Sequence, residues 1–89
     1  MNVEEVVLQA HNQLLDSLGK ERRSKPDAKM SRGYGIDSVG IVTLILDIEE
    51  MLDIDLEPYL QEIRNAYYVK DLINVVEKAY NEQKGNENE

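Results

Sequence analysis

The chain has 89 residues, of which 18 are acidic and 10 basic, and its formal charge is −8. It contains no cysteine, which excludes a disulfide scaffold and any metal site built on thiolates. A single histidine, His11, excludes a site with several histidine ligands and leaves little for general base catalysis. A chain of this size has no room for two lobes around a substrate cleft. We therefore expect one domain that is not an enzyme itself and that other proteins act on.

The charge is unevenly distributed along the chain. Residues 20–32 contain six basic and two acidic residues and so carry a local charge of +4. Because the net charge is −8, the other residues together carry −12. This acidic balance argues against nucleic acid as a partner. The first residues are acidic and unlike a signal peptide, and the most apolar stretch, residues 41–46, is far shorter than the ~20 residues of a membrane span. We expect a monomeric cytoplasmic protein without a membrane span.

Apolar residues at helical spacing predict a first helix over residues 3–18. They recur at intervals of three, four and seven residues, which gives one apolar stripe. Gly19 follows directly and is well placed to end this helix. Residues 20–36 contain Pro26 and Gly35 and almost no large apolar residue, so they predict a loop. Its length exceeds that of usual helix connections, which indicates either a functional segment or local disorder.

A second helix is predicted from Asp37 or Ser38 to Leu52, and its apolar residues cover more than one face. Such a helix is either the central one of the fold or presents apolar side chains to a partner. Acidic residues fill its C-terminal half, where they oppose the helix dipole at a small cost. This placement indicates a use for these charges other than stability.

The rest of the chain predicts two further helices. Pro58 suits the first turn of a short helix over residues 58–63, and helical spacing of apolar residues returns over 68–80. The polar residues 81–89 predict a flexible tail. Because no alternating strand pattern of useful length is present, the predicted fold of residues 1–80 is all-α: a small four-helix bundle with three longer helices, one short helix and a long first loop.

A serine stands where the long loop meets the second helix, in the segment Gly35-Ile36-Asp37-Ser38-Val39. Aspartate and serine are preferred helix caps, so a purely structural role is one interpretation. A nucleophilic serine would need an adjacent base, and the sequence offers only the distant His11. A helix N-terminus does favour an anion, because it carries positive partial charge and unpaired N–H donors.

Short motifs around and after this serine resemble those of the acyl carrier protein family. Asp37-Ser38 matches the core of that family's phosphopantetheine-attachment region. The length, helix order and acidity of the chain are similar as well, over residues 3–80. The other matching stretches are Glu49-Glu50-Met51-Leu52, Ile54-Asp55-Leu56 and Tyr68-Val69-Lys70-Asp71-Leu72.

The resemblance implies a phosphoprotein in which a phosphopantetheinyl transferase attaches 4′-phosphopantetheine to Ser38. The thiol of this arm would hold acyl groups as thioesters for fatty-acid, polyketide or related lipid and secondary-metabolite biosynthesis. Asp37 would help to hold the metal ion and the cofactor during the transfer, although it also suits a helix cap. The implied partners are the transferase, an acyl-loading ligase or acyltransferase, and synthase- or reductase-type enzymes.

The resemblance also implies surfaces for these partners and for the acyl chain. Val39 and Leu46 would enter partner pockets, with membership of the core as the alternative. Glu49 and Glu50 would form an acidic docking face, with a merely solvated face as the alternative. Each buried CH₂ stabilises by roughly 0.8 kcal/mol, so the bundle could also enclose an acyl chain. The candidates for the lining of that pocket are Leu46, Leu56 and Ile63.

Some positions depart from the family pattern. Tyr34, Gly40 and Thr43 stand where fatty-acid carriers have a leucine and two acids, and the basic run over residues 20–32 is unusual. These departures favour a specialised stand-alone carrier. A D-alanyl or other aminoacyl carrier is an alternative, because such carriers often show Asp-Ser-hydrophobic-Gly. A helical protein-interaction module that is not modified at Ser38 is the alternative from another class.

Overall fold

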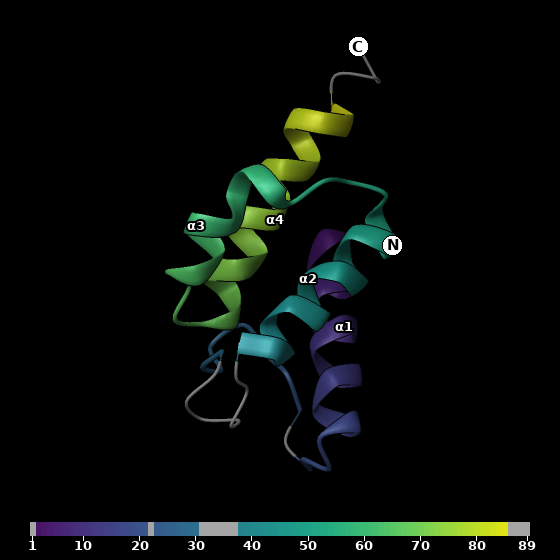
Figure 1. Ribbon diagram of the computed structural model, residues 1–89, viewed down its shortest axis with the longest axis vertical. Coiled ribbons are helices and arrows are strands. Elements are labelled where there is room, and N and C mark those ends of the chain that lie inside the picture. The colour runs from purple at the N-terminus through teal and green to yellow at the C-terminus, as the bar shows by residue number, and fades with distance from the viewer. Residues whose placement is uncertain (1, 22, 31–37, 86–89) are drawn as a thin grey trace.

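The computed structural model describes residues 2–21, 23–30 and 38–85 of the chain. These residues form the helices α1 (Val3–Ser17), α2 (Ser38–Leu52), α3 (Leu60–Arg64) and α4 (Val69–Lys84), with the 3-10 turn η1 (Glu57–Tyr59) leading into α3. Within the described ranges there is no strand, and only a single isolated bridge joins Lys29 and Tyr68. The fold is a small all-α bundle of three longer helices and one short one, as predicted (Figure 1).

The ends of α1 follow directly from its sequence. Asn2 caps the helix, since its side-chain oxygen accepts a hydrogen bond from the Glu5 N–H at 2.8 Å. At the other end Gly19 has a φ of 73°, and the Lys20 N–H donates to the Leu15 carbonyl at 2.9 Å. This is the left-handed helix ending that glycine adopts without steric cost, so the predicted stop at Gly19 is confirmed.

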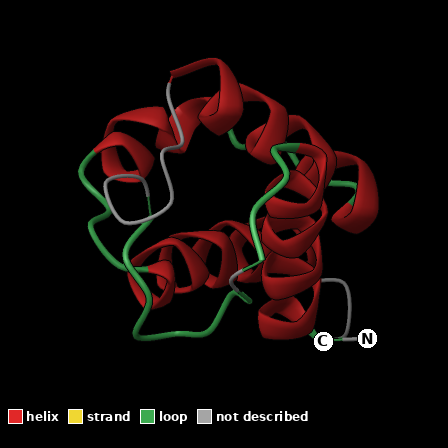
Figure 2. Ribbon diagram, turned by 90° about the horizontal axis from the view of Figure 1, so that it is seen from below, coloured by secondary structure: helices red, strands yellow, loops and turns green. Residues whose placement is uncertain are grey.

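The core lies between the apolar faces of α1, α2 and α4. Helix α1 packs against both α2 and α4, and the short α3 packs against α4. Figure 2 shows the helices arranged around one centre. The fully buried large apolar side chains are Val6, Val7, Leu15, Leu44, Ile48, Leu56, Val69, Leu72 and Val76. Because α2 packs on α1 and α3 packs on α4, a space remains between α2 and the segment that leads into α3.

The segment that follows α2 is fixed by one glutamate of that helix. The Ile54 N–H donates to the Glu49 carbonyl at 3.3 Å, and the Leu56 N–H donates to the Glu49 side-chain oxygen Oε2 at 2.7 Å. Asp53, which directly precedes Ile54, has a φ of 54°, the left-handed conformation that ends the helix. Glu49 thus sets the direction in which the chain leaves α2 and enters η1.

Part of the long first loop is attached to the start of α4. The Met30 N–H donates to the Tyr67 carbonyl at 2.9 Å, and the Val69 and Lys70 N–H groups donate to the Ala28 and Pro26 carbonyls, each at 2.8 Å. These two N–H groups belong to the first turn of α4, whose donors have no partner within the helix. Residues 26–30 of the predicted loop therefore serve as the cap of a distant helix, and residues 31–36 of that loop lie outside the described residues.

Helix α4 is longer than predicted. It ends at Lys84 rather than at residue 80, so residues 81–84 of the predicted tail are helical. Gln83 explains the extension: its amide accepts from the Asp55 N–H at 2.8 Å and donates to the Asp55 carbonyl at 2.7 Å. Lys84 also forms an ion pair with Asp53 at 3.2 Å. Residues 86–89 of the predicted tail lie outside the described residues.

Candidate functional site

Ser38 is the first residue of α2. The helix thus begins at the serine that the sequence singles out. Asp37 and the side chain of Ser38 lie outside the described part of the structure. The site is therefore built from the position of Ser38 on the helix and from the side chains that follow it.

Three apolar side chains form an exposed stripe along α2. Val39, Val42 and Leu46 expose 73%, 54% and 58% of their surface, although each is large and apolar. Their spacing of three and four residues places them on one side of the helix. Val39 and Leu46 thus lie on the surface and not in the core. Val42, which completes the stripe, was not singled out from the sequence.

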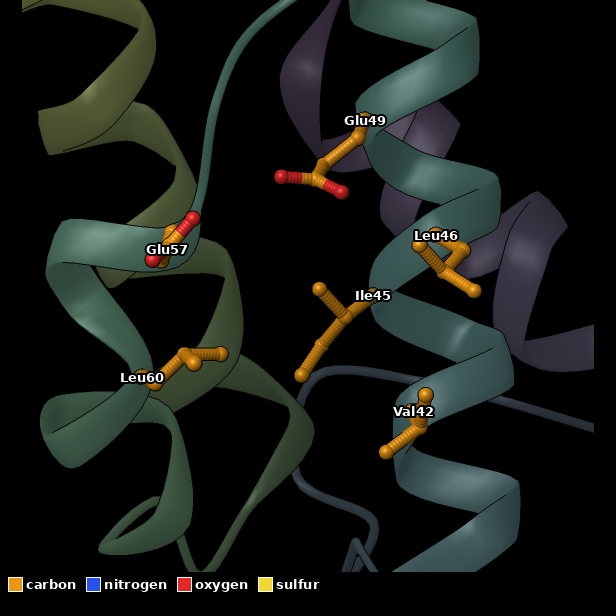
Figure 3. Close-up of a pocket in the computed structure, with 6 residues that line it drawn as sticks. All are labelled: Val42, Ile45, Leu46, Glu49, Glu57 and Leu60. Atoms are coloured by element: carbon orange, nitrogen blue, oxygen red, sulfur yellow. The ribbon is translucent and has the colours of Figure 1, made fainter.

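A groove of about 290 Å³ lies between α2 and the segment formed by η1 and α3. One wall consists of Val42, Ile45, Leu46 and Glu49 of α2, and the other of Glu57 and Leu60 (Figure 3). Four of these six side chains are apolar, and the two charged ones are both carboxylates. Figure 3 shows the Glu49 carboxylate pointing from α2 across the groove toward η1, where Glu57 lies.

The position of Ser38 lies on the side of α2 that faces this groove. Val42, Ile45 and Glu49 follow it by four, seven and eleven residues, close to whole turns of a helix with 3.6 residues per turn. At about 1.5 Å per residue, Ile45 lies about 10 Å and Glu49 about 16 Å further along the helix axis than Ser38. A group attached at Ser38 would therefore begin at one end of the face that lines the groove.

The predicted acyl-pocket residues divide into two groups. Leu46 lines the groove, whereas Leu56 and Ile63 are buried in the core, with exposures of 0% and 3%. The hydrogen bond from the Leu56 N–H to Glu49 explains part of this, since it holds the segment after α2 against the helix. Ile45, Glu57 and Leu60 line the groove but were missed. The sequence carries no local signal for them, because the groove arises from the packing of α2 and α3 on different helices.

The two glutamates predicted to form one docking face differ in their surroundings. Glu50 is exposed, in keeping with a place on the outer surface. Glu49 is only partly exposed, lines the groove and accepts the hydrogen bond from Leu56. Glu49 thus has a structural role within the bundle, and Glu50 remains the candidate for contact with partners.

The basic run of the first loop is held by contacts with α1 and with the start of α4. Arg23 forms an ion pair with Asp16 of α1. The Lys29 ammonium lies 5.6 Å from the centre of the Tyr67 ring, and Lys70 of α4 lies 5.4 Å from that of Tyr68. The described residues of this loop lie at the lower end of the molecule in Figure 1, the end at which α2 begins. The described basic residues of the loop are therefore placed by α1 and by the start of α4.

Comparisons with protein-family models, with curated proteins and with solved structures find no match to this chain. In the portion of the chain that the structure describes, no helix combines the length and the apolar character needed to cross a membrane. The same portion contains no group of three His, Asp or Glu side chains placed to hold a metal ion.

Proposed function

We propose that this protein is a carrier that holds acyl intermediates as thioesters on a 4′-phosphopantetheine arm attached to Ser38. The observation that carries the proposal is the position of Ser38: it begins α2 on the face that lines the groove, next to the exposed stripe Val39, Val42 and Leu46. The chain itself is proposed to be non-catalytic. The resemblance to acyl carrier proteins supports the same function independently of this geometry.

The proposed modification joins the arm to the protein through a phosphodiester. The serine oxygen forms a bond to the β-phosphorus of coenzyme A, the pyrophosphate bond breaks, and adenosine 3′,5′-bisphosphate leaves. The serine proton passes to a base of the transferase. The product carries a negative charge at the start of α2, where the helix dipole favours it.

The groove fits the arm in length and in polarity. The arm is about 14 bonds long from the serine oxygen to its sulfur, and an extended chain advances roughly 1.2 Å per bond, so its reach is about 17 Å. Glu49, at the far end of the groove, lies about 16 Å from Ser38 along the axis of α2. Between them Val42, Ile45 and Leu46 offer apolar contacts. When bound, the arm supplies the thiol that this cysteine-free chain lacks.

The exposed stripe supports a role for α2 in binding partner enzymes. Val39 and Leu46 would enter apolar pockets of the transferase, of the loading ligase or acyltransferase, and of synthase- or reductase-type enzymes. Glu50 adds a charge beside the stripe, one turn beyond Leu46. The same stripe also favours a second candidate function, a protein-interaction module that binds a partner through α2 without any modification.

One experiment separates the two functions. The purified apoprotein is incubated with coenzyme A and a broad-specificity phosphopantetheinyl transferase, and its intact mass is measured. We expect a single phosphopantetheine increment that is absent in Ser38→Ala. Ser17→Ala serves as the matched control and should be modified like the unaltered chain, because Ser17 lies in the last turn of α1. A chain that stays unmodified while an established carrier is converted in parallel would contradict the carrier function and leave the interaction module.

A further inference from the structure

The far end of the groove differs from the rest of it in charge. The part nearer to Ser38 is lined by Val42, Ile45 and Leu46, and the opposite end brings Glu49 of α2 close to the side of the groove on which Glu57 lies (Figure 3). No basic side chain is among the described residues that line the groove. A neutral chain therefore has favourable contacts only along part of the groove, whereas a positive charge has favourable contacts at its acidic end.

The length of the arm determines which part of a carried group meets these carboxylates. Its reach of about 17 Å from Ser38 brings the sulfur to the level of Glu49, about 16 Å along the helix. An extended arm laid along α2 would thus occupy the apolar length of the groove. The first atoms of the acyl group, next to the thioester carbonyl, would then reach the end of the groove that Glu49 and Glu57 line.

Three kinds of acyl group behave differently in this position. Methylene groups of a fatty chain would displace water from two carboxylates, which disfavours them. A carboxylated acyl group would add a third negative charge to the same end of the groove. An ammonium next to the carbonyl would instead be attracted by both carboxylates and would relieve their mutual repulsion.

We infer that the group this protein carries is an aminoacyl group, held with its ammonium between the carboxylates of Glu49 and Glu57. This inference rests on the proposed function, because it requires the arm on Ser38. Glu49 is positioned for the task by its hydrogen bond from the Leu56 N–H at 2.7 Å, which fixes one carboxylate oxygen and leaves the other to face the groove. The backbone of Glu57 is fixed at the start of η1, where its N–H donates to the Asp55 side chain at 3.0 Å.

The test compares three forms of the protein whose arms carry acyl groups of similar size and different charge. The transferase loads the protein with amide analogues of alanyl-, isobutyryl- and malonyl-phosphopantetheine, in which NH replaces the thioester sulfur and prevents hydrolysis. Alanyl and isobutyryl groups differ only in an ammonium in place of a methyl group. After intact mass has shown complete loading, the Tm of each form is measured by circular dichroism.

We expect the alanyl form to have a Tm about 2–5 °C above that of the isobutyryl form, the size expected for a partly exposed charge pair in a small domain. The malonyl form should have the lowest Tm of the three. Glu49→Gln and Glu57→Gln should each reduce the difference between the alanyl and isobutyryl forms. The amide of Glu49→Gln can still accept the Leu56 N–H, so this variant should retain the fold.

Asp47→Asn is the matched control for these variants. It removes one negative charge from the same helix, nine residues from Ser38 and therefore on the opposite side of α2. It should leave the difference between the alanyl and isobutyryl forms unchanged. Equal Tm values for these two forms, or a difference that persists in both glutamine variants, would overturn the inference while leaving the carrier function intact. Failure to load any arm would instead contradict the proposed function, and the inference with it.

Discussion

His11 connects the first loop to α1 from within the protein. Its side chain is buried, and its Nδ1 lies 2.6 Å from the hydroxyl oxygen of Ser24. The neighbouring Asn12 accepts a hydrogen bond from the Ser24 N–H, also at 2.6 Å. Burial disfavours the charged imidazolium and lowers the pKa of His11 to about 4. The only histidine of the chain is thus a neutral structural group that holds the loop in place.

This pKa predicts how stability depends on pH. In the unfolded chain the histidine has a pKa near 6.5, so between about pH 6.5 and 4 the unfolded state binds a proton that the folded state does not. The free energy of unfolding should therefore fall as the pH falls through this window, by about 1–2 kcal/mol between pH 7 and pH 5. Urea denaturation at several pH values measures it.

The variant His11→Asn provides the control for this prediction. Its amide can replace the hydrogen bond to Ser24 but does not titrate, so the variant should lose most of the dependence on pH between 7 and 5. It should also be less stable at pH 7, because a smaller side chain leaves space in the core. The same slope in both proteins would show that other groups cause the dependence.

At the scale of the helices, the start of α4 is held from two sides. Asp71 accepts hydrogen bonds from the Tyr68 N–H at 2.9 Å and from the Tyr67 N–H at 3.3 Å. From the other side, the Ala28 carbonyl accepts from the Val69 N–H, and the Pro26 carbonyl accepts from the Lys70 N–H. A carboxylate in the first turn also interacts favourably with the helix dipole. Asp71 therefore supports both the helix and the docking of the first loop.

Replacement of Asp71 by alanine should destabilise the protein by about 1 kcal/mol, the usual effect of removing a side chain that caps a helix. The loss leaves two backbone donors without their partner. Hydrogen exchange should also become faster at the Met30 amide, which donates to the Tyr67 carbonyl from the attached loop. Glu77→Ala, on the exposed part of the same helix, is the control. It should change the free energy of unfolding by no more than a few tenths of a kcal/mol and should leave hydrogen exchange at Met30 unchanged. Unchanged exchange at Met30 in Asp71→Ala would mean that the loop is held without help from this residue.

The helices show which features the sequence could predict. Gly19 and Ser38 mark helix boundaries through their own conformational preferences, and the structure has boundaries at both places. The end of α4 depends instead on Gln83, whose partner Asp55 lies 28 residues earlier in the chain. The groove depends on Glu57 and Leu60, which acquire their place only when α3 packs against α4. Local signals thus predicted the elements, and contacts distant in sequence determined the helix end and the site.

At the scale of the whole molecule, the residues outside the basic run 20–32 carry a charge of −12. The chain carries −8 in total, and the protein measures 42 × 25 × 21 Å. The ion pairs of the described residues, Arg23–Asp16, Lys78–Glu62 and Lys84–Asp53, lie at the surface, where each contributes little. Repulsion among the remaining carboxylates therefore outweighs attraction between opposite charges.

Salt should consequently stabilise this protein. At about 0.01 M salt the Debye length is about 30 Å, so carboxylates across the whole molecule repel one another; at about 0.1 M it is about 10 Å and only close charges interact. We expect the Tm to rise by about 2–5 °C over this range of sodium chloride, equivalent to roughly 0.5–1 kcal/mol for a domain of this size.

A variant with Asp47→Asn, Glu50→Gln and Glu77→Gln has a net charge of −8 plus 3, that is −5. Its Tm should be higher at low salt and should change less with salt, since it has less repulsion to screen. A Tm that falls with salt in the unaltered chain would show that attractive pairs, including those of the basic loop, dominate its electrostatics.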